Sequence, residues 1–214
     1  MSFEGFPQET LDYLAELAAH NDREWFEAHR EDYERWYVEP ARQFVVAAGE
    51  RLHRFAPHTH AEPRILGSIF RINRDTRFSK DKRPYKDHLD FWFWDGDRAA
   101  AASGFFVRIS PQLVGIGAGS HGLDTGQRSA FREAMSKEGP RLKLEDIASS
   151  LVRSGYTLSS PLSPRASSLY VHVDEPASLA LEPQLLNRCA EHWHHLLPLH
   201  RWLVDHVQLV ITAT

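Results

Sequence analysis

Apolar residues recur at helical spacing in the first quarter of the chain. They lie three or four positions apart over residues 8–20 and again over residues 25–55, which is the period of an amphipathic helix. Asn21 and Asp22 separate the two runs and offer a cap for the second, while Pro40 predicts a kink or a break within it. This pattern predicts a helical hairpin at the N-terminus.

Alternation of apolar and polar positions replaces helical spacing in the middle of the chain. It separates Phe91 and Phe93 from Trp92 and Trp94, so one pair should enter the core while the other faces helices or borders a loop. Pro111 separates the last two of four such runs. The predicted strands are residues 65–72, 89–94, 104–110 and 112–118. Together they indicate a mostly antiparallel sheet.

Helical spacing returns in the last part of the chain. It is present over residues 126–135, 144–152 and 183–207, whereas residues 156–180 have no clear pattern. No internal repeat and no long linker divides the sequence. We therefore expect one α+β domain over residues 1–214, with an N-terminal helical hairpin, a central mostly antiparallel sheet of about four strands, and C-terminal helices.

The amino-acid composition excludes several kinds of protein. The 214 residues are 42% hydrophobic and 25% charged, enough for a sizeable core, and the net charge of −4 gives no global attraction to nucleic acid or acidic lipid. Cys189 is the only cysteine, which excludes an intrachain disulfide and suits a reducing compartment. With no leader and no apolar run of membrane length, we expect a cytoplasmic protein without membrane association, either a monomer or a homodimer.

Positive charge is concentrated in one segment, residues 71–86. It carries four arginines and three lysines against two aspartates, a local charge of 7 − 2 = +5. Such a density repels itself unless it is solvated, paired with carboxylates or bound to an anion, and the planar fork of arginine suits phosphate or carboxylate. The predicted strand 65–72 would place Arg71 on the same face as Ile69, beside structured backbone.

The leading hypothesis is a site here for a phosphate- or carboxylate-bearing small molecule, in an enzyme or a ligand sensor. The residues expected to contact or orient the anion are Arg71, Arg74, Arg77, Asp75, Ser79, Lys82 and Lys86. If chemistry takes place, Tyr85 with Lys82 or Lys86 is the expected proton-transfer pair, because a nearby ammonium lowers the pKa of a phenol. Asp81 is a rival base.

A family resemblance rests on the same residues. The segment reads Arg71-x-x-Arg74-Asp75-x-Arg77-Phe78-x-x-Asp81-Lys82-x-x-Tyr85. It resembles the defining motif of a bacterial family of unknown function, domain of unknown function 2461. The surroundings are similar to that family at residues 5–7, 21–26, 29–30, 67–70 and 115–119, so that the resemblance covers about residues 3–150. The resemblance implies that this segment is the one that defines the family, but it implies no reaction.

A glycine-rich stretch, residues 117–122, satisfies G-x-G-x-x-G between a predicted strand and a predicted helix. A Rossmann unit needs βαβ alternation, whereas helix follows helix here, so we predict no dinucleotide cofactor. A turn that reverses the chain is the simpler interpretation. A narrower one is an anion nest, in which the amides of Gly117 and Gly119 cooperate with the arginines.

Two other motifs are weak. Residues 79–82 match the S-x-x-K spacing of serine acyl enzymes, but Pro84 argues against the helix on which that motif depends. His192 and His195 at helical spacing, with Glu191, could hold a divalent ion, but without an HExxH motif they are better explained as surface or interface histidines. We therefore expect no metal.

Two alternative functions remain open. The basic segment could serve a nucleic-acid-associated module, with an exposed tryptophan on a base and cations on backbone phosphates. Those cations would be Lys80, Arg83 and Lys86. Alternatively, the arginines could form a structural network that holds the helical hairpin to the sheet and binds no ligand. Their partners would be Glu24, Glu27 and Glu31. The ligand itself, and the choice between catalyst and binder, stay open.

Overall fold

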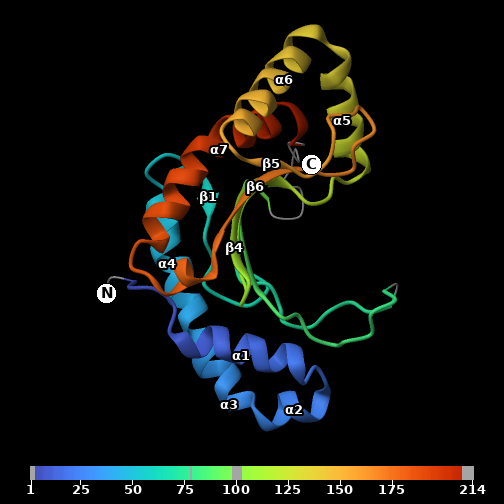
Figure 1. The fold of residues 1–214 in the computed structure, drawn as a ribbon. Helices are drawn as coiled ribbons and strands as arrows, with labels where there is room; N and C mark the ends of the chain where they lie inside the picture. Colours follow the sequence, from blue (N-terminus) through green and yellow to red (C-terminus); the bar gives the residue numbers. More distant parts are fainter. Residues whose placement is uncertain (1–2, 78, 98–102, 209–214) are drawn as a thin grey trace.

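A computed structural model describes residues 3–77, 79–97 and 103–208. Its N-terminal part is helical, as the spacing predicts (Figure 1). The helices are α1 (Gln8–Ala19), α2 (Arg23–Ala28), α3 (Arg30–Asp32) and α4 (Glu39–Leu52), with a π-helical segment at Tyr33–Val38. The Asp22 side chain caps α2 by accepting from the Trp25 amide at 2.9 Å. Pro40, predicted to mark a kink or a break, lies in the first turn of α4, directly after the π-helical segment, where its missing N–H costs nothing.

The sheet has six antiparallel strands in the order β1-β2-β3-β4-β6-β5. The strands are β1 (Thr59–His60), β2 (Leu89–Asp95), β3 (Gly104–Ile109), β4 (Leu113–Ser120), β5 (Thr157–Leu158) and β6 (Leu169–Pro176). Strands β2, β3 and β4 confirm three of the four predicted strands. Strands β1, β5 and β6 were not predicted, and the last two come from the stretch without a clear pattern.

The strand predicted over residues 65–72 is wrong. This segment makes only isolated bridges, from Ile69 to Ile65 and to Phe91. Ile69 and Ile72 are buried while Arg71 is exposed, so the burial period is three residues and Arg71 does not share a face with Ile69. A tight turn, in which the Gly67 amide donates to the Arg64 carbonyl, replaces the strand.

Three C-terminal helices complete the fold. They are α5 (Thr125–Ser136), α6 (Glu138–Arg153) and α7 (Leu185–Val207), and a 3₁₀ turn, Ala177–Leu181, precedes α7. Asp124 and Gln127 form a capping box at the start of α5. Within the described residues, no helix is long and apolar enough to cross a membrane.

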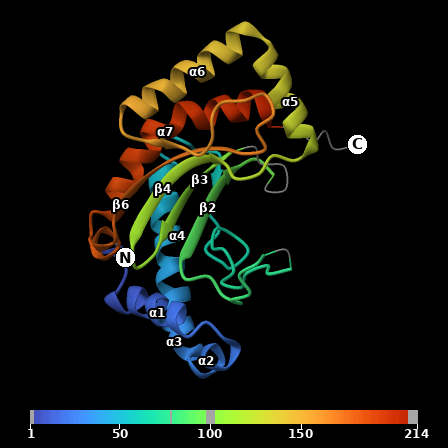
Figure 2. The same cartoon turned by 45° about the vertical axis from the view of Figure 1, so that its right-hand side comes forward.

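The core lies between one face of the sheet and helices α4 and α7 (Figure 2). Phe44 of α4 packs on Phe91 with ring centroids 4.6 Å apart, and Trp193 of α7 packs on Phe93 at 5.5 Å. Figure 1 shows the sheet nearly edge-on, with α4 and α7 on one side. The opposite face, called the open face here, looks away from both helices and is where polar side chains gather.

Candidate functional site

Strand register places two parallel rows of residues on the open face. The charged row runs across four strands as Asp90, Arg108, Gly115 and Asp174. The aromatic row beside it is Trp92, Phe106, Gly117 and His172. Their chain neighbours point the other way, as fully buried Phe91, Val107 and Ile116 illustrate. The alternation predicted for β2 is thus confirmed from Phe91 to Phe93, with both phenylalanines in the core and Trp92 only partly buried, whereas Trp94, expected to match Trp92, is buried and stacks on His60.

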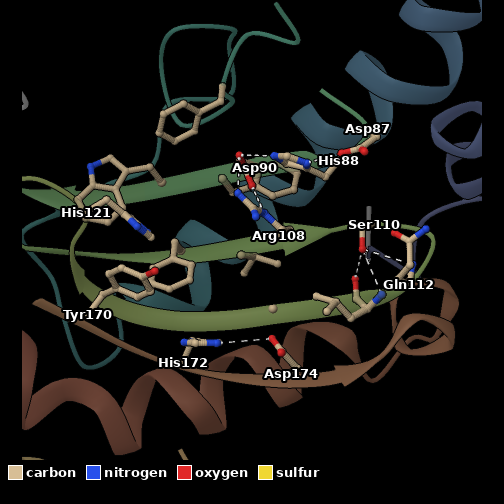
Figure 3. Close-up of a pocket in the computed structure, with 17 residues that line it drawn as sticks. Asp87, His88, Asp90, Arg108, Ser110, Gln112, His121, Tyr170, His172 and Asp174 are labelled. Atoms are coloured by element: carbon tan, nitrogen blue, oxygen red, sulfur yellow. Dashed lines mark hydrogen bonds and ion pairs between the residues drawn. The ribbon is translucent and has the colours of Figure 1, made fainter. Parts of the chain in front are cut away.

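A groove of about 580 Å³ lies over these rows (Figure 3). Its walls also include Phe70, Asp87, His88, Ser110, Gln112, Leu113, His121 and Tyr170. The volume falls in the range of small-molecule sites. The lining combines aromatic faces with convergent charges, which is the usual composition of such a site.

Asp90 is the centre of the charged end of the groove. It accepts from Arg108 Nε at 2.7 Å and Nη2 at 3.2 Å, and Lys86 Nζ lies 3.3 Å away. Burial alone would raise the pKa of Asp90, but the hydrogen bonds and charges of His88 and Arg108 outweigh it and hold this pKa well below its usual range. Asp90 is therefore ionised at neutral pH and fixes the guanidinium of Arg108 in place.

His88 bridges two carboxylates at the same end. Its Nδ1 lies 2.8 Å from Asp87 Oδ1 and its Nε2 lies 3.2 Å from Asp90 Oδ2. Because an ionised carboxylate only accepts, both contacts are hydrogen bonds only when the ring carries two protons. In that state three cations, Lys86, His88 and Arg108, face two carboxylates, and the cluster has a charge of 3 − 2 = +1.

Arg108 keeps part of its guanidinium available to the groove. Its contacts with Asp90 use Nε and Nη2, and among the described residues Nη1 makes no hydrogen bond. The side chain is 49% exposed. Across the strand from it, Gly115 has no side chain, and a Cβ there would meet nothing nearer than 3.5 Å. The atom at that distance is Asp174 Oδ1, so the donor available to an anion here is Nη1 on the side of Arg108 away from Asp90.

Glycines shape the aromatic end. A Cβ on Gly117 would collide with the Phe106 ring, and one on Gly104 would lie 2.7 Å from Trp92 Cζ2, so both rings lie close over bare backbone. His121 packs on Phe106 at 4.7 Å and on Tyr170 at 4.2 Å, between ring centroids. Burial lowers the pKa of His121, and this ring is therefore neutral at pH 7.

The basic arm, residues 71–77 and 79–86 of the described chain, projects from the body of the fold (Figures 1 and 2), and its last residue, Lys86, contacts Phe70 and Asp90 of the groove lining. A bridge joins Asn73 to Tyr85, and the Lys86 amide donates to the Ile72 carbonyl at 2.8 Å. Asn21 holds the arm at its base, because its side chain both accepts from the Tyr85 amide at 3.0 Å and donates to the Tyr85 carbonyl at 3.1 Å.

Charges in the basic arm pair largely with one another. Two Asp-x-Arg units have the same geometry: each aspartate accepts from the backbone amide, Nε and Nη2 of the arginine two residues on. The units are Asp75 with Arg77 and Asp81 with Arg83. Arg74 adds a 2.7 Å ion pair to Asp81. Within the described chain, Arg74 and Arg83 make their ion pairs with Asp81 and Asp87, not with the helical glutamates considered above.

The residues expected to transfer protons lie outside the groove. Burial raises the pKa of Tyr85, which stacks on Phe26 at 4.3 Å, so the expected lowering of this pKa is wrong. Lys82 donates to the Thr76 carbonyl at 2.9 Å. Hydrogen bonds from Arg83 and Arg74 hold the pKa of Asp81 well below its usual range, and Asp81 is therefore a weak base.

The structure separates the other predicted anion contacts. Gly117 and Gly119 lie inside β4, paired with both β3 and β6, so the anion nest proposed for their amides is wrong at these positions. Ser79 lies outside any helix, as Pro84 predicts, and its amide donates to the Thr76 carbonyl at 3.3 Å. Lys86 does not line the groove, but it contacts two residues that do: it pairs with Asp90 at 3.3 Å and lies over the Phe70 ring at 4.8 Å.

Comparison with models of known protein families shows which family this chain belongs to. The model of a family described as conserved hypothetical protein (DUF2461) matches residues 9–153. The chain belongs to this family. Comparisons with curated proteins and with solved structures find no match. The DUF2461 match includes the basic arm and strands β2 to β4 but ends before β6. One wall of the groove, with Tyr170, His172 and Asp174, thus lies outside the matched residues.

The histidines near the C-terminus form a hydrogen-bonded chain. Tyr156 Oη lies 2.9 Å from His192 Nδ1 and 3.3 Å from His195 Nδ1, and His192 Nε2 lies 2.9 Å from Glu175 Oε1. These contacts join α7 to β6 and to the residue before β5. No group of three potential ligands suited to a metal ion occurs among the described residues of this DUF2461 protein.

Proposed function

We propose that this protein binds a phosphate- or carboxylate-bearing small molecule in the groove on the open face of its sheet. Arg108 is the principal anion contact in this proposal. The supporting observation is its geometry: Asp90 fixes two nitrogens of the guanidinium, while Nη1 makes no hydrogen bond among the described residues and the side chain is 49% exposed. A guanidinium that is already oriented loses little entropy when it binds an anion.

The charges around Arg108 support the same proposal. Lys86 and His88 add positive charge within one cluster, and Asp87 and Asp90 neutralise only two of the three cations when His88 is doubly protonated. Lys86 belongs to the basic arm, so the segment singled out by its sequence is linked to the groove through the ion pair with Asp90. The remaining arm cations are engaged with aspartates or exposed.

Acid–base chemistry, if the protein is a catalyst, falls to His121 in this proposal. A neutral imidazole offers one acceptor and one donor nitrogen, and its position in the groove wall places it where a bound ligand lies. Tyr85 is unsuitable because burial raises its pKa and its ring packs on Phe26.

The test is a thermal-shift screen against phosphate- and carboxylate-bearing small molecules, with Arg108→Ala beside wild type. Arg141→Ala is the matched control, because Arg141 also pairs with a carboxylate, Glu145 at 2.9 Å, but lies on α6 outside the groove. We expect a compound that stabilises wild type and the control, and whose affinity falls roughly 10- to 150-fold in Arg108→Ala. Equal stabilisation of Arg108→Ala would overturn the proposal.

Nucleic acid is the second candidate, and the exposed basic arm favours it. The Arg77 side chain is 77% exposed, and Arg71 makes no ion pair within the described chain. Stabilisation by short oligonucleotides that disappears at high salt, and that Lys80→Ala with Arg71→Ala weakens, would favour this candidate. A small anion held in the groove responds far less to salt.

We also propose a cytoplasmic location in a bacterial cell. Its support is Cys189, the only cysteine, which is fully buried with the pKa of its thiol raised by burial. Such a thiol is a poor nucleophile and a poor disulfide partner. Fractionation of cells that produce the protein tests the location, and recovery outside the cytoplasm would contradict it.

A further inference from the structure

Strand register and two glycines build the floor of the aromatic end. Trp92 and Phe106 are direct cross-strand partners, and glycine stands next to each ring, Gly104 for Trp92 and Gly117 for Phe106. Both rings are only partly buried and line the groove, whereas Phe91, Phe93 and Phe105 fill the core on the other face. Partly exposed aromatic rings that line a groove offer surfaces on which another ring can stack.

From this floor and the charged row beside it, we infer that the ligand is an aromatic or heteroaromatic acid. Its ring stacks over Trp92 and Phe106, and its carboxylate or phosphate binds Arg108. This inference rests on the proposed function, since it uses the same anion contact, and it adds the class of molecule that carries the anion.

The spacing of the two rows limits the shape of this molecule. Neighbouring rows on one face of an antiparallel sheet are two residues apart along each strand, about 7 Å. Phe106 and Arg108 are separated in this way on β3, as are Trp92 and Asp90 on β2. A ring centred on the aromatic row therefore needs a short linker before its acid group reaches the charged row. Inorganic phosphate alone would leave the aromatic half of the groove unfilled.

His121 and Tyr170 complete the ring site as a side wall. Their rings lie 4.2 Å apart, and Tyr170 also meets Phe106 at 5.8 Å, nearly perpendicular. Among the described residues, the His121 ring nitrogens make no hydrogen bond, so they are available to a heteroatom at the ring edge. A heteroaromatic ring is thus the better fit, and a carbocyclic ring can use the floor alone.

The experiment compares three carboxylates of similar length by isothermal titration calorimetry: 3-phenylpropionate, its saturated analogue 3-cyclohexylpropionate, and hexanoate. Indole-3-propionate is the heteroaromatic probe. We expect the two aromatic acids to bind most tightly. Trp92→Leu should weaken them roughly 2- to 12-fold and leave hexanoate unchanged, because leucine keeps an apolar side chain but removes the flat face. Trp36→Leu, outside the groove, is the control.

The outcomes separate this inference from the proposed function. If the saturated acid binds as tightly as the aromatic one, or if neither Trp92→Leu nor Tyr170→Leu weakens the aromatic acids, the inference is overturned. The proposed function then survives, provided that Arg108→Ala still abolishes binding. If Arg108→Ala leaves the binding of every acid unchanged, the proposed function itself fails. Unfolding temperatures of the unliganded variants verify that each one is folded.

Discussion

Asp90 gives a strong test of the charge cluster, because its carboxylate contacts three basic side chains, Lys86, His88 and Arg108. In Asp90→Asn the volume is kept but the negative charge is lost, and Lys86, His88 and Arg108 are left facing one another. Removing one partner of a buried ion pair costs about 3–5 kcal/mol. The Asp90 side chain is 17% exposed but that of Arg108 is 49% exposed, so solvent screening reduces the expected loss to about 2–3 kcal/mol.

The pH dependence of this loss has a definite sign. The pKa of Asp90 is lower in the folded protein than in the unfolded chain, so its contribution to stability is present above the unfolded value, about 3.9, and is lost as pH falls through the folded value. Wild type should therefore exceed Asp90→Asn by its full margin at pH 6–7. The margin should shrink progressively below about pH 4.

Urea unfolding at several pH values measures both effects. Asp174→Asn is the matched control, because Asp174 lies in the same row but is 52% exposed and only approaches His172, at 4.0 Å. It should cost less than about 0.5 kcal/mol. A stability of Asp90→Asn equal to that of wild type at pH 7, or a margin that does not change with pH, would refute the charge cluster described here.

Three further changes test other parts of the structure. Gly117→Ala should lower the free energy of unfolding in urea by about 1–3 kcal/mol and weaken the binding of aromatic acids, because its Cβ displaces the Phe106 ring. Gly115→Ala, on the same strand, should cost far less. Equal losses of stability would contradict the close packing of Phe106 on Gly117. Tyr85→Phe should leave the binding of acids unchanged, since the Tyr85 ring packs on Phe26 outside the groove. Loss of binding would show that the Tyr85 hydroxyl takes part in the site. Asp81→Asn should speed cleavage of the basic arm by trypsin without lowering the unfolding temperature of the protein, and unchanged cleavage would show that the Asp81 contacts do not order the arm.

Local patterns predicted much of the fold because they carry their own period. Strands β2, β3 and β4 were predicted from alternation, and the caps and apolar spacing predicted the main helices. Strand β6 also alternates, with Leu169 and Val171 inward and Tyr170 and His172 outward. It was missed because loops surround it in residues 156–180, and its partner β5 has only two residues.

The error at residues 65–72 has a physical reason. Isoleucines at 65, 69 and 72 suit a strand by propensity, but spacings of four and three residues also allow a turn that buries Ile69 and Ile72 together. Propensity measures the fit of a side chain to a pleated surface, not the pairing of the backbone. Here the chain pairs through single bridges instead of a continuous ladder.

The candidate site was harder to predict because its residues come from separate strands. A high density of charge along the chain identifies only residues that are close in sequence, and for this reason it pointed to the basic arm. In the structure, aspartates of the arm form ion pairs with most of its arginines. Asp90, Arg108 and Asp174 meet only through the register of four strands, which sequence alone does not fix. One usable signal was present: glycine at 115, 117 and 119 alternates with apolar residues, which indicates a bare strip on one face of a strand.

A crystal structure of the protein with indole-3-propionate would test the central claim most directly. The account predicts that the carboxylate lies within hydrogen-bond distance of the Arg108 guanidinium and that the indole lies over Trp92 and Phe106. A carboxylate bound instead by the arginines of the basic arm, with the groove empty, would contradict this account. It would show that the anion site lies in the basic arm, as the sequence first indicated.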